Sequence, residues 1–333
     1  MSFTTIILQW FRVHGRELPW RQTRDPYAVW LSEIILQQTR IDQGRPYWER
    51  FMSRWPTVEM LASASEDEVL RQWQGLGYYS RARNLHAAAR QIVAAGGFPK
   101  TIDGLRALKG VGDYTAAAIG SIAFDLPAAV VDGNVYRVLA RHFGIDTPIN
   151  TTAGKKEFTM LAQSLLPTDS ASEYNQAMMD FGAIQCTPSS PLCGQCPLSE
   201  TCSAFRTGRT ATLPVKLKKT EVKERHLTYI YIRCKGQTVL RRRPAGDIWQ
   251  GLYEPPCMAI DDERLRGKQL TLLRKNVRHV LTHRVLYADF WLWETNERPP
   301  LPEGYFWIDE ADIDRYAVPR LVEKMLEECN IFC

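Results

Sequence analysis

Four cysteines lie close together in the segment CTPSSPLCGQCPLSETC, which covers residues 186–202. They follow the spacing C-x6-C-x2-C-x5-C and are Cys186, Cys193, Cys196 and Cys202. Structural zinc sites usually present two close pairs of ligands, whereas only Cys193 and Cys196 form such a pair here. Four thiolates without a histidine also suit an iron–sulfur cluster. The spacing therefore favours an iron–sulfur cluster over zinc, with free core thiols as a third alternative.

Two carboxyl residues occupy positions at which acid–base chemistry is feasible. Glu33 lies in the apolar segment WLSEIIL, where it is either the exposed position of an amphipathic helix or a residue that faces a pocket. In a pocket, lost solvation would raise the pKa of its carboxyl and make it a proton donor near neutral pH. Asp132 precedes a helix, which an aspartate can cap while the N–H groups and the dipole keep it ionised. Such a pair suits the breaking of a glycosidic bond.

The segment LKGVGDYTAAA, residues 108–118, places Gly110, Val111 and Gly112 between two helical stretches. Glycine allows close approach of another molecule, and the following helix begins with unpaired N–H groups and a positive dipole end. The turn can therefore bind a phosphate, although a tight turn between packed helices is the simpler alternative. Because Lys109 lies in the turn, the segment matches a helix-hairpin-helix, which grips a nucleic-acid backbone without reading its sequence.

Most of the chain is predicted to be helical, so helices must position these residues. Up to about residue 210, apolar residues recur at intervals of three and four, which predicts amphipathic helices joined by short loops. Ser65 and Glu68 fit a capping box, and Gly96 with Gly97 fits a helix end. The expected helices include residues 28–40, 65–76, 80–97, 114–124 and 133–144.

After the cysteines the pattern becomes that of strands. Residues 216–226 are charged and lack an apolar period, which predicts a linker. Beyond it, segments such as HLTYIYIRC and YFWID alternate β-branched and aromatic residues, and PRLVEKMLEEC returns to a helical pattern. We therefore predict a mainly α domain at residues 1–215, which contains the cysteine loop 186–202, and a smaller α+β domain at residues 227–333.

The composition is that of an ordinary soluble protein, with 45% hydrophobic and 24% charged residues. No apolar run reaches the roughly eighteen residues of a membrane span, and the first residues lack the features of a signal peptide. The net charge of +5 and the pI of about 8.7 permit a nucleic-acid partner without requiring one. We expect an intracellular protein without a disulfide framework, because the remaining cysteines are scattered singly. They are Cys234, Cys257, Cys329 and Cys333.

Five segments, in this order, resemble the adenine DNA glycosylases of the helix-hairpin-helix base-excision family. They are SEIILQQT (32–39), GLGYYSRARNLH (75–86), LKGVGDYT (108–115), VDGNVYRVL (131–139) and the cysteine quartet. The resemblance covers the first 215 residues and implies that the quartet carries a 4Fe–4S cluster. It also implies a DNA repair enzyme that hydrolyses the N-glycosidic bond of adenine mispaired with 8-oxoguanine or guanine in double-stranded DNA.

The same resemblance assigns roles to individual residues. It implies that Glu33 protonates N7 of an extruded adenine and that Asp132 stabilises the oxocarbenium-like sugar, with or without a transient covalent adduct. Tyr114 and Asn134 match active-site positions that support these two carboxyls. The further matches are Arg16, Trp20, Arg21 and Gln176 in the adenine pocket, Gln38 and Tyr78 in the base stack opened by flipping, and Lys109, Gly110, Val111 and Gly112 on the DNA backbone. Surface charge or core packing explains the four pocket matches almost as well, and a helix-end amide and a packed loop tyrosine are alternatives for the two base-stack matches.

Tyr114 also bears on the reaction type. Related glycosylases that cut the DNA strand carry a lysine at this hairpin position, and its amine forms a Schiff base with the deoxyribose. A tyrosine cannot form that bond. We therefore predict a monofunctional enzyme that leaves an intact abasic site.

The C-terminal domain loosely resembles the Nudix-like lesion-recognition domain of the same family. No glutamate-rich REx2E-type run follows GLYEPP, so pyrophosphatase activity is not expected. HVLTHRV, residues 279–285, occupies the position of the family's Phe-Ser-His loop, which reads 8-oxoguanine. Here Leu281 replaces the aromatic residue, while Thr282 and His283 retain the hydroxyl and the imidazole. A strand turn with a surface histidine is the alternative.

The expected partner is a DNA duplex, bound by a monomer without any membrane, in the bacterial cytoplasm with the nucleoid or in a eukaryotic nucleus. Because the cysteines lie outside the carboxyl motifs and Arg206 and Arg209 follow them, we expect the cluster to fix a loop against DNA phosphate rather than to cleave the bond. Redox sensing of DNA is the alternative role. Two rival functions are a glycosylase of the same fold acting on thymine or an oxidised pyrimidine, and a non-catalytic DNA-binding module. Glu33 argues against the first rival, since protonation of a purine nitrogen requires such an acid.

Overall fold

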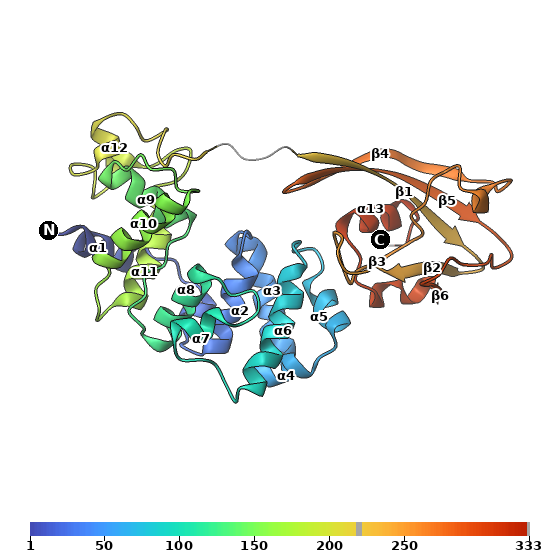
Figure 1. Ribbon diagram of the computed structural model, residues 1–333, viewed down its shortest axis with the longest axis horizontal. Coiled ribbons are helices and arrows are strands. Elements are labelled where there is room, and N and C mark those ends of the chain that lie inside the picture. Colours follow the sequence, from blue (N-terminus) through green and yellow to red (C-terminus); the bar gives the residue numbers. More distant parts are fainter. Residues whose placement is uncertain (218–221, 332–333) are drawn as a thin grey trace. The chain divides into compact units, whose positions relative to one another are not determined.

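The structure is a computed structural model that describes residues 1–217 and 222–331 (Figure 1). Residues 218–221 of the expected linker therefore lie outside the described residues, as does Cys333. The strand that follows begins at Lys223, still within the expected linker of residues 216–226. Part of that segment thus belongs to a sheet. The sequence did not predict this strand start, because its residues are mostly charged and show no apolar alternation.

Two compact units make up the chain. The helical unit comprises Met1–Ala62 and Ala87–Lys218, and the mixed unit comprises Ser63–His86 and Lys219–Cys333. The grouping of Ser63–His86 with the C-terminal residues was not anticipated from the sequence. Its cause is visible in side-chain contacts such as Arg242 with Glu66 and Asp67 at 2.9 and 3.0 Å.

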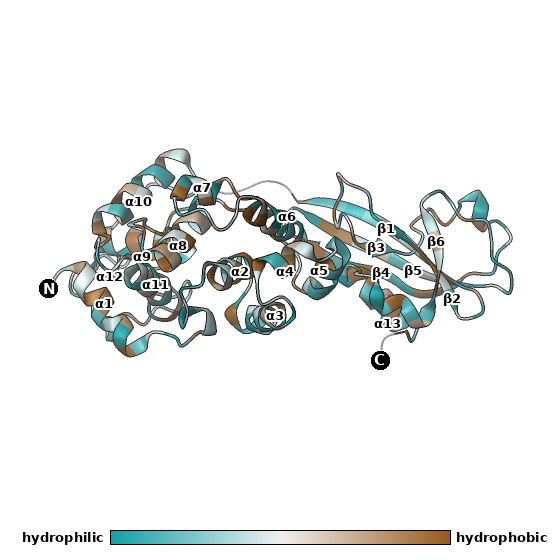
Figure 2. Cartoon of the chain, turned by 90° about the horizontal axis from the view of Figure 1, so that it is seen from below, coloured by the Kyte–Doolittle hydropathy of each residue, from teal (hydrophilic) through white to brown (hydrophobic). Residues whose placement is uncertain are grey.

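The helical unit is built almost entirely of helices. Its elements are α1 (Phe3–His14), η1 (Pro19–Arg21), α2 (Pro26–Leu36), α3 (Ile41–Arg54), α4 (Val58–Ser63), α7 (Ile102–Arg106), α8 (Asp113–Phe124), α9 (Gly133–Phe143), α10 (Thr152–Leu165), α11 (Ala171–Asp180), η2 (Phe181–Gln185), η3 (Cys193–Gln195) and α12 (Ser203–Arg206). Hydrophilic and hydrophobic residues share most of these helices (Figure 2), as the amphipathic prediction requires, whereas α2 and α8 are buried on nearly every side.

Local signals fix the ends of several helices. The side chain of Ser65 accepts from the backbone N–H of Glu68, and the Glu68 carboxylate accepts from the backbone N–H of Ser65. The predicted capping box therefore begins α5 (Glu66–Trp73). Helix α6 (Ser80–Ala94) ends before Gly96, whose φ of 79° is left-handed, as predicted. By contrast, α2 ends at Leu36, four residues before the expected end at residue 40.

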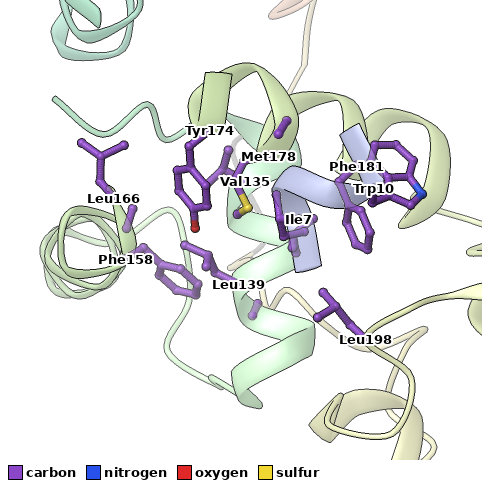
Figure 3. Close-up of a cluster of buried hydrophobic side chains, with 14 of the residues drawn as sticks. Ile7, Trp10, Val135, Leu139, Phe158, Leu166, Tyr174, Met178, Phe181 and Leu198 are labelled. Carbon is purple, nitrogen blue, oxygen red and sulfur yellow. The ribbon is translucent and has the colours of Figure 1, made fainter. Parts of the chain in front are cut away.

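The main core of the helical unit lies between α1, α9, α10 and α11 (Figure 3). Its aromatic side chains pack closely, and the rings of Trp10 and Phe181 form a T-shaped pair with a ring-centroid distance of 4.9 Å. The labelled members of this core are Ile7, Trp10, Val135, Leu139, Phe158, Leu166, Tyr174, Met178, Phe181 and Leu198. Because α9 contributes one face to this core, its N-terminal residue Asp132 is held in place.

The mixed unit contains two three-stranded sheets. In one, β1 (Lys223–Arg233) pairs in parallel with β5 (Arg284–Glu294), which pairs antiparallel with β4 (Thr271–Leu281). In the other, β2 (Gln237–Arg242) lies between β3 (Tyr253–Glu254) and β6 (Tyr305–Asp309). Short 3-10 turns, η4 and η5, cover Glu263–Leu265 and Glu310–Arg315, and α13 covers Arg320–Glu328. The predicted α+β character is confirmed.

Helix α13 closes the core of the mixed unit. Its residues Leu321, Val322, Met325 and Leu326 are fully buried among side chains of β1 and β5. Among the described residues, no helix combines the length and the apolar character needed to cross a bilayer.

Candidate active site

A cavity of about 920 Å³ opens in the helical unit. Its wall includes every residue predicted for catalysis or adenine binding, namely Arg16, Trp20, Arg21, Glu33, Tyr114, Asp132, Asn134 and Gln176. These residues come from η1, α2, α8, α11, the N-terminus of α9 and the loop after α1. Side chains more than 140 residues apart in the chain therefore meet at one place, and the fold, not local sequence, assembles the site.

Glu33 faces this cavity from the middle of α2. The helix is buried on nearly its whole circumference, from Tyr27 to Ile35, and Glu33 itself is only 8% exposed. The interpretation of Glu33 as an exposed polar position is therefore wrong. Burial raises the pKa of Glu33 to about 7, while a hydrogen bond from the Tyr114 hydroxyl and the charge of Arg21 oppose the rise. Near neutral pH this carboxyl can donate a proton.

Asp132 caps α9, as the sequence predicted. Its carboxylate accepts hydrogen bonds from the backbone N–H groups of Asn134 and Val135, both at 2.8 Å, and from Nδ2 of Asn134 at 2.7 Å. Burial raises the pKa of Asp132 above its ordinary value, while these bonds and the charge of Arg137 oppose the rise. The three donors limit the rise and fix both oxygens.

Tyr114 bonds Glu33 and lies within electrostatic range of Asp132. It lies at the second residue of α8, and its hydroxyl bonds Glu33 and also lies 3.5 Å from Sδ of Met179. Burial and the nearby charges of Glu33 and Asp132 raise the pKa of Tyr114 well above its ordinary value. The phenol therefore stays neutral and acts as a hydrogen-bond donor.

The cysteine quartet lines a second, small cavity of about 30 Å³. All four thiols are half-buried and free of disulfides. Burial raises the pKa of Cys193 and Cys196, and the charges of neighbouring cysteines add to the rise. Among the described residues, no three His, Cys, Asp or Glu side chains are close enough together to hold a single metal ion. The four cysteines are therefore recognised as one site by the cavity that they share. The donor set and its convergence fit a cluster held by four thiolates.

Arginines of α9 tie this cysteine loop to the helix. Arg141 donates to Sγ of Cys186 at 3.3 Å and to the carbonyls of Thr187 and Pro188 at 2.7 and 2.9 Å. Arg137 donates to the carbonyl of Cys186 at 2.7 Å and to Oδ1 of Asn134 at 2.8 Å. Sequence reasoning missed both arginines, although basic residues inside a helix next to a cysteine loop offered a signal.

Comparison with known proteins identifies the family. The profile described as HhH-GPD superfamily base excision DNA repair protein matches residues 31–163, a NUDIX domain matches residues 228–328, and the iron–sulfur binding domain of endonuclease III matches residues 186–202. An adenine DNA glycosylase of Buchnera aphidicola from Acyrthosiphon pisum is 30% identical over 99% of each chain. Another, from Schizaphis graminum, is 33% identical over 82% of this chain and 78% of its own. This chain belongs to the adenine DNA glycosylase family.

Solved structures agree with the fold of this adenine DNA glycosylase family member. A structure described as a thermostable thymine-DNA glycosylase is 32% identical and superposes with a TM-score of 0.58 over 62% of this chain and 95% of that chain. An endonuclease III–DNA complex is 24% identical with a TM-score of 0.53, which supports the fold alone. The predicted helix-hairpin-helix glycosylase fold followed by a Nudix-like domain is thereby confirmed.

The iron–sulfur match decides between the metals left open by the sequence. The match ends at the first and last cysteine of the quartet, Cys186 and Cys202. The cofactor of this glycosylase family member is therefore a 4Fe–4S cluster. Cys186, Cys193, Cys196 and Cys202 would hold it, and the cluster would link the loop after η2 to η3 and α12.

The predicted DNA-backbone turn lies between α7 and α8. Lys109, Gly110 and Gly112 are exposed, and the φ of Gly110 is 79°, a conformation that glycine adopts without strain. Val111 is buried, so its side chain serves the core while its backbone stays in the turn. Gly112 precedes α8 without any side-chain cap, which leaves N–H groups available for a phosphate.

Both predicted base-stack residues are among the seven non-glycine residues of the described chain that have left-handed backbones. Gln38 follows α2 with a φ of 55° and is exposed. Tyr78, in the mixed unit, has a φ of 48°, and its hydroxyl lies 2.7 Å from Oγ1 of Thr282. Strained backbones of this kind concentrate at functional sites. Thr282 and His283 form the exposed two-residue turn between β4 and β5, where the lesion loop was expected.

Two residues around the cavity were not predicted. Asp180, at the end of α11, is fully buried and binds the guanidinium groups of Arg16 and Arg21. Arg137 reaches Asn134 as described above. No sequence motif identifies Asp180, because its partners lie 159 and 164 residues away in the chain.

Proposed function

We propose that this protein is a monofunctional adenine DNA glycosylase that acts in base excision repair. Its substrate is adenine paired with 8-oxoguanine or guanine in double-stranded DNA, and it works as a monomer in the compartment that holds the chromosome. The observation that carries the proposal is the cavity shared by Glu33 and Asp132, in which one carboxyl has its pKa raised to about 7. The names of the relatives support adenine as the excised base.

The proposed reaction starts with adenine flipped into the cavity. Glu33 gives its proton to N7 of the base, which makes the base a better leaving group. The bond between C1′ and N9 then breaks, and its electron pair goes to the purine. Asp132 stabilises the positive charge that develops on the sugar, and its fixed oxygens need little reorganisation. Water then adds to C1′ and leaves an abasic site, while its proton goes to the Glu33 carboxylate, which restores the acid.

The remaining predicted residues support this reaction. Asn134 orients Asp132 through the 2.7 Å bond, and Tyr114 orients Glu33. We propose that Trp20, Arg16, Arg21 and Gln176 surround the adenine, since all four line the cavity. Because Tyr114 provides no amine, strand cleavage through a Schiff base has no nucleophile at this position.

We propose that the mixed unit reads the base opposite the adenine. The exposed hydroxyl of Thr282 and the imidazole of His283 can bond the lesion, and Tyr78 lies beside Thr282. The turn of Lys109, Gly110, Val111 and Gly112 would hold the phosphate backbone, and Gln38 would fill the space left by the flipped base. The 4Fe–4S cluster fixes the cysteine loop, which with Arg206 and Arg209 would lie against phosphate.

A panel of duplexes tests the proposal. Each duplex carries one mispair, adenine with 8-oxoguanine, adenine with guanine, thymine with guanine, or an oxidised pyrimidine, and abasic sites are revealed by heating in alkali. We expect release of adenine alone, fastest opposite 8-oxoguanine. Release of thymine would instead favour the activity named for the structural neighbour that is 32% identical. Binding without any base release would favour a non-catalytic module.

A second assay tests the monofunctional prediction. The protein is incubated with an adenine mispair and borohydride, which traps a Schiff base covalently. We expect no trapped complex and no strand break before alkali treatment. A trapped complex at high yield would contradict the prediction.

A further inference from the structure

We infer that Asp180 is a positioning residue of the active site, which holds Arg21 and Arg16 at the cavity and balances the charge that Arg21 exerts on Glu33. The inference rests on the proposed role of Glu33 as the acid. Asp180 does not line the cavity and acts only through the two arginines.

The geometry around Asp180 is that of a built anchor. Arg21 binds it in a bidentate manner, with Nη1 donating to Oδ2 at 2.8 Å and Nη2 donating to Oδ1 at 2.9 Å. Arg16 donates its backbone N–H to Oδ2 at 2.9 Å and its Nε to Oδ1 at 3.0 Å, with a further bond from Nη2. Nη1 of Arg21 also donates to the carbonyl of Arg16 at 3.1 Å. One carboxylate therefore fixes both cations.

The charges do not cancel within this cluster. Asp180 has no exposed side-chain surface, whereas the side chains of Arg21 and Arg16 are 14% and 34% exposed. Burial opposes ionisation of Asp180, but the hydrogen bonds from Arg21 and Arg16 outweigh it and lower its pKa. Two cations thus share one anion, and a single positive charge remains at the wall of the cavity. A buried ion cluster is a costly way to stabilise a fold, which points to a use of this charge.

That use is visible at Glu33. Arg21 lowers the pKa of Glu33, whereas burial and the charge of Asp132 raise it. The groups that face Glu33 are thus Arg21 from η1, Tyr114 from α8 and Asp132 at the N-terminus of α9. The other charged residues of the cavity wall are Arg16, Glu17, Arg40, Asp42 and Arg45. Without Asp180, the full charge of Arg21 would favour the ionised form of Glu33, which cannot donate a proton.

The test is the pH profile of adenine release by Asp180→Asn under single-turnover conditions. Asparagine keeps the size of the side chain and removes its charge. We expect the basic limb of the profile to move to lower pH by about one pH unit, so that release at pH 8 falls by about tenfold beyond any loss at low pH. A basic limb at the wild-type position in a folded variant would overturn the inference, since a merely structural role would not move it.

Arg16→Gln provides a second test with the opposite sign. Its side chain is partly exposed, so the variant is expected to fold even where Asp180→Asn does not. Without this cation, Asp180 pairs with Arg21 alone and offsets more of its charge. The pKa of Glu33 should then rise, and the basic limb should move to higher pH. A limb that stays in place, or moves down, would overturn the inference.

Asp125→Asn is the matched control. Asp125 also pairs with an arginine, Arg24, but both side chains are at least 60% exposed and neither lines the cavity. The basic limb of the pH profile of Asp125→Asn should coincide with that of the wild type. Failure of the wild-type protein to release adenine would refute the proposed function itself, whereas normal release with an unmoved limb in Asp180→Asn would refute only the role of Asp180.

Discussion

The middle of α2 and the N-terminus of α9 each supply a carboxyl to one cavity, yet they treat it differently. Glu33 on α2 has one hydrogen bond, from Tyr114, and burial raises its pKa to about 7. Asp132 before α9 has three hydrogen bonds from Asn134 and Val135, which oppose its burial. The comparison teaches that burial raises the pKa of both carboxyls, and that the donors around each one set what opposes that rise.

The largest effect should come from removing the acid of this pair. Glu33→Gln keeps the size and polarity of the side chain but has no proton to give, so adenine release should fall by about 10²–10⁴-fold. Single-turnover release from an 8-oxoguanine mispair measures the loss, and gel-shift titration checks that DNA binding persists. Glu157→Gln, at an exposed position of α10, is the control and should keep the wild-type rate. Full release by Glu33→Gln would contradict the assignment.

The same substitution should change stability in the opposite direction. Burial raises the pKa of Glu33 from 4.5 to about 7, so the folded state binds a proton more tightly than the unfolded state. The stability linked to that proton is complete below about pH 4.5 and is lost as the pH rises through 7. Glu33→Gln should escape this loss and exceed the wild type at pH 8 by about 2–3 kcal/mol. Urea unfolding at pH 5 and pH 8 measures it, and equal pH dependence of both proteins would sink the idea.

A smaller effect is expected when one donor is taken from Asp132. Asn134 donates to Oδ2 of Asp132 at 2.7 Å, and this bond lowers the pKa of Asp132. Asn134→Ala removes the bond. The pKa of Asp132 should rise, and the acidic limb of the pH profile should move to higher pH. A lost hydrogen bond to a charged group corresponds to a rate loss of about tenfold. The pH profile of single-turnover release checks this, and an unmoved acidic limb would show that Asn134 does not tune Asp132.

The smallest effect should follow from removing the single donor to Glu33. Tyr114→Phe deletes a hydrogen bond that lowers the pKa of Glu33, so the basic limb should move to higher pH. Release at pH 6 should change by less than about tenfold. Tyr136→Phe, on α9 and outside the cavity wall, is the matched control. A downward move of the basic limb in Tyr114→Phe would reverse the proposed direction.

Local rules explain which parts of the fold could be predicted. The cap formed by Asp132 and the box of Ser65 and Glu68 depend on neighbours within three residues, and both were predicted correctly. The cysteine spacing within residues 186–202 likewise favoured an iron–sulfur cluster, and the family match then decided against the zinc alternative. Such features need no knowledge of the tertiary structure.

Features that depend on distant partners could not be decided in the same way. The burial of Glu33 follows from the packing of α2 against α8, and an apolar helix with one glutamate is compatible with either environment. Asp180 finds its partners about 160 residues earlier in the chain. The grouping of Ser63–His86 with the C-terminal residues also depends on long-range contacts, such as Gln74 with Glu323 at 2.5 Å.

The size of the cavity has a consequence for the product. A single purine is far smaller than 920 Å³, so the cavity cannot enclose a free base closely and should bind it weakly. The duplex itself must supply the fit, because the flipped nucleotide arrives tethered to its strand. Once the tether is cut, adenine should diffuse away readily, and the free base should be a poor inhibitor even at concentrations far above that of the mispair.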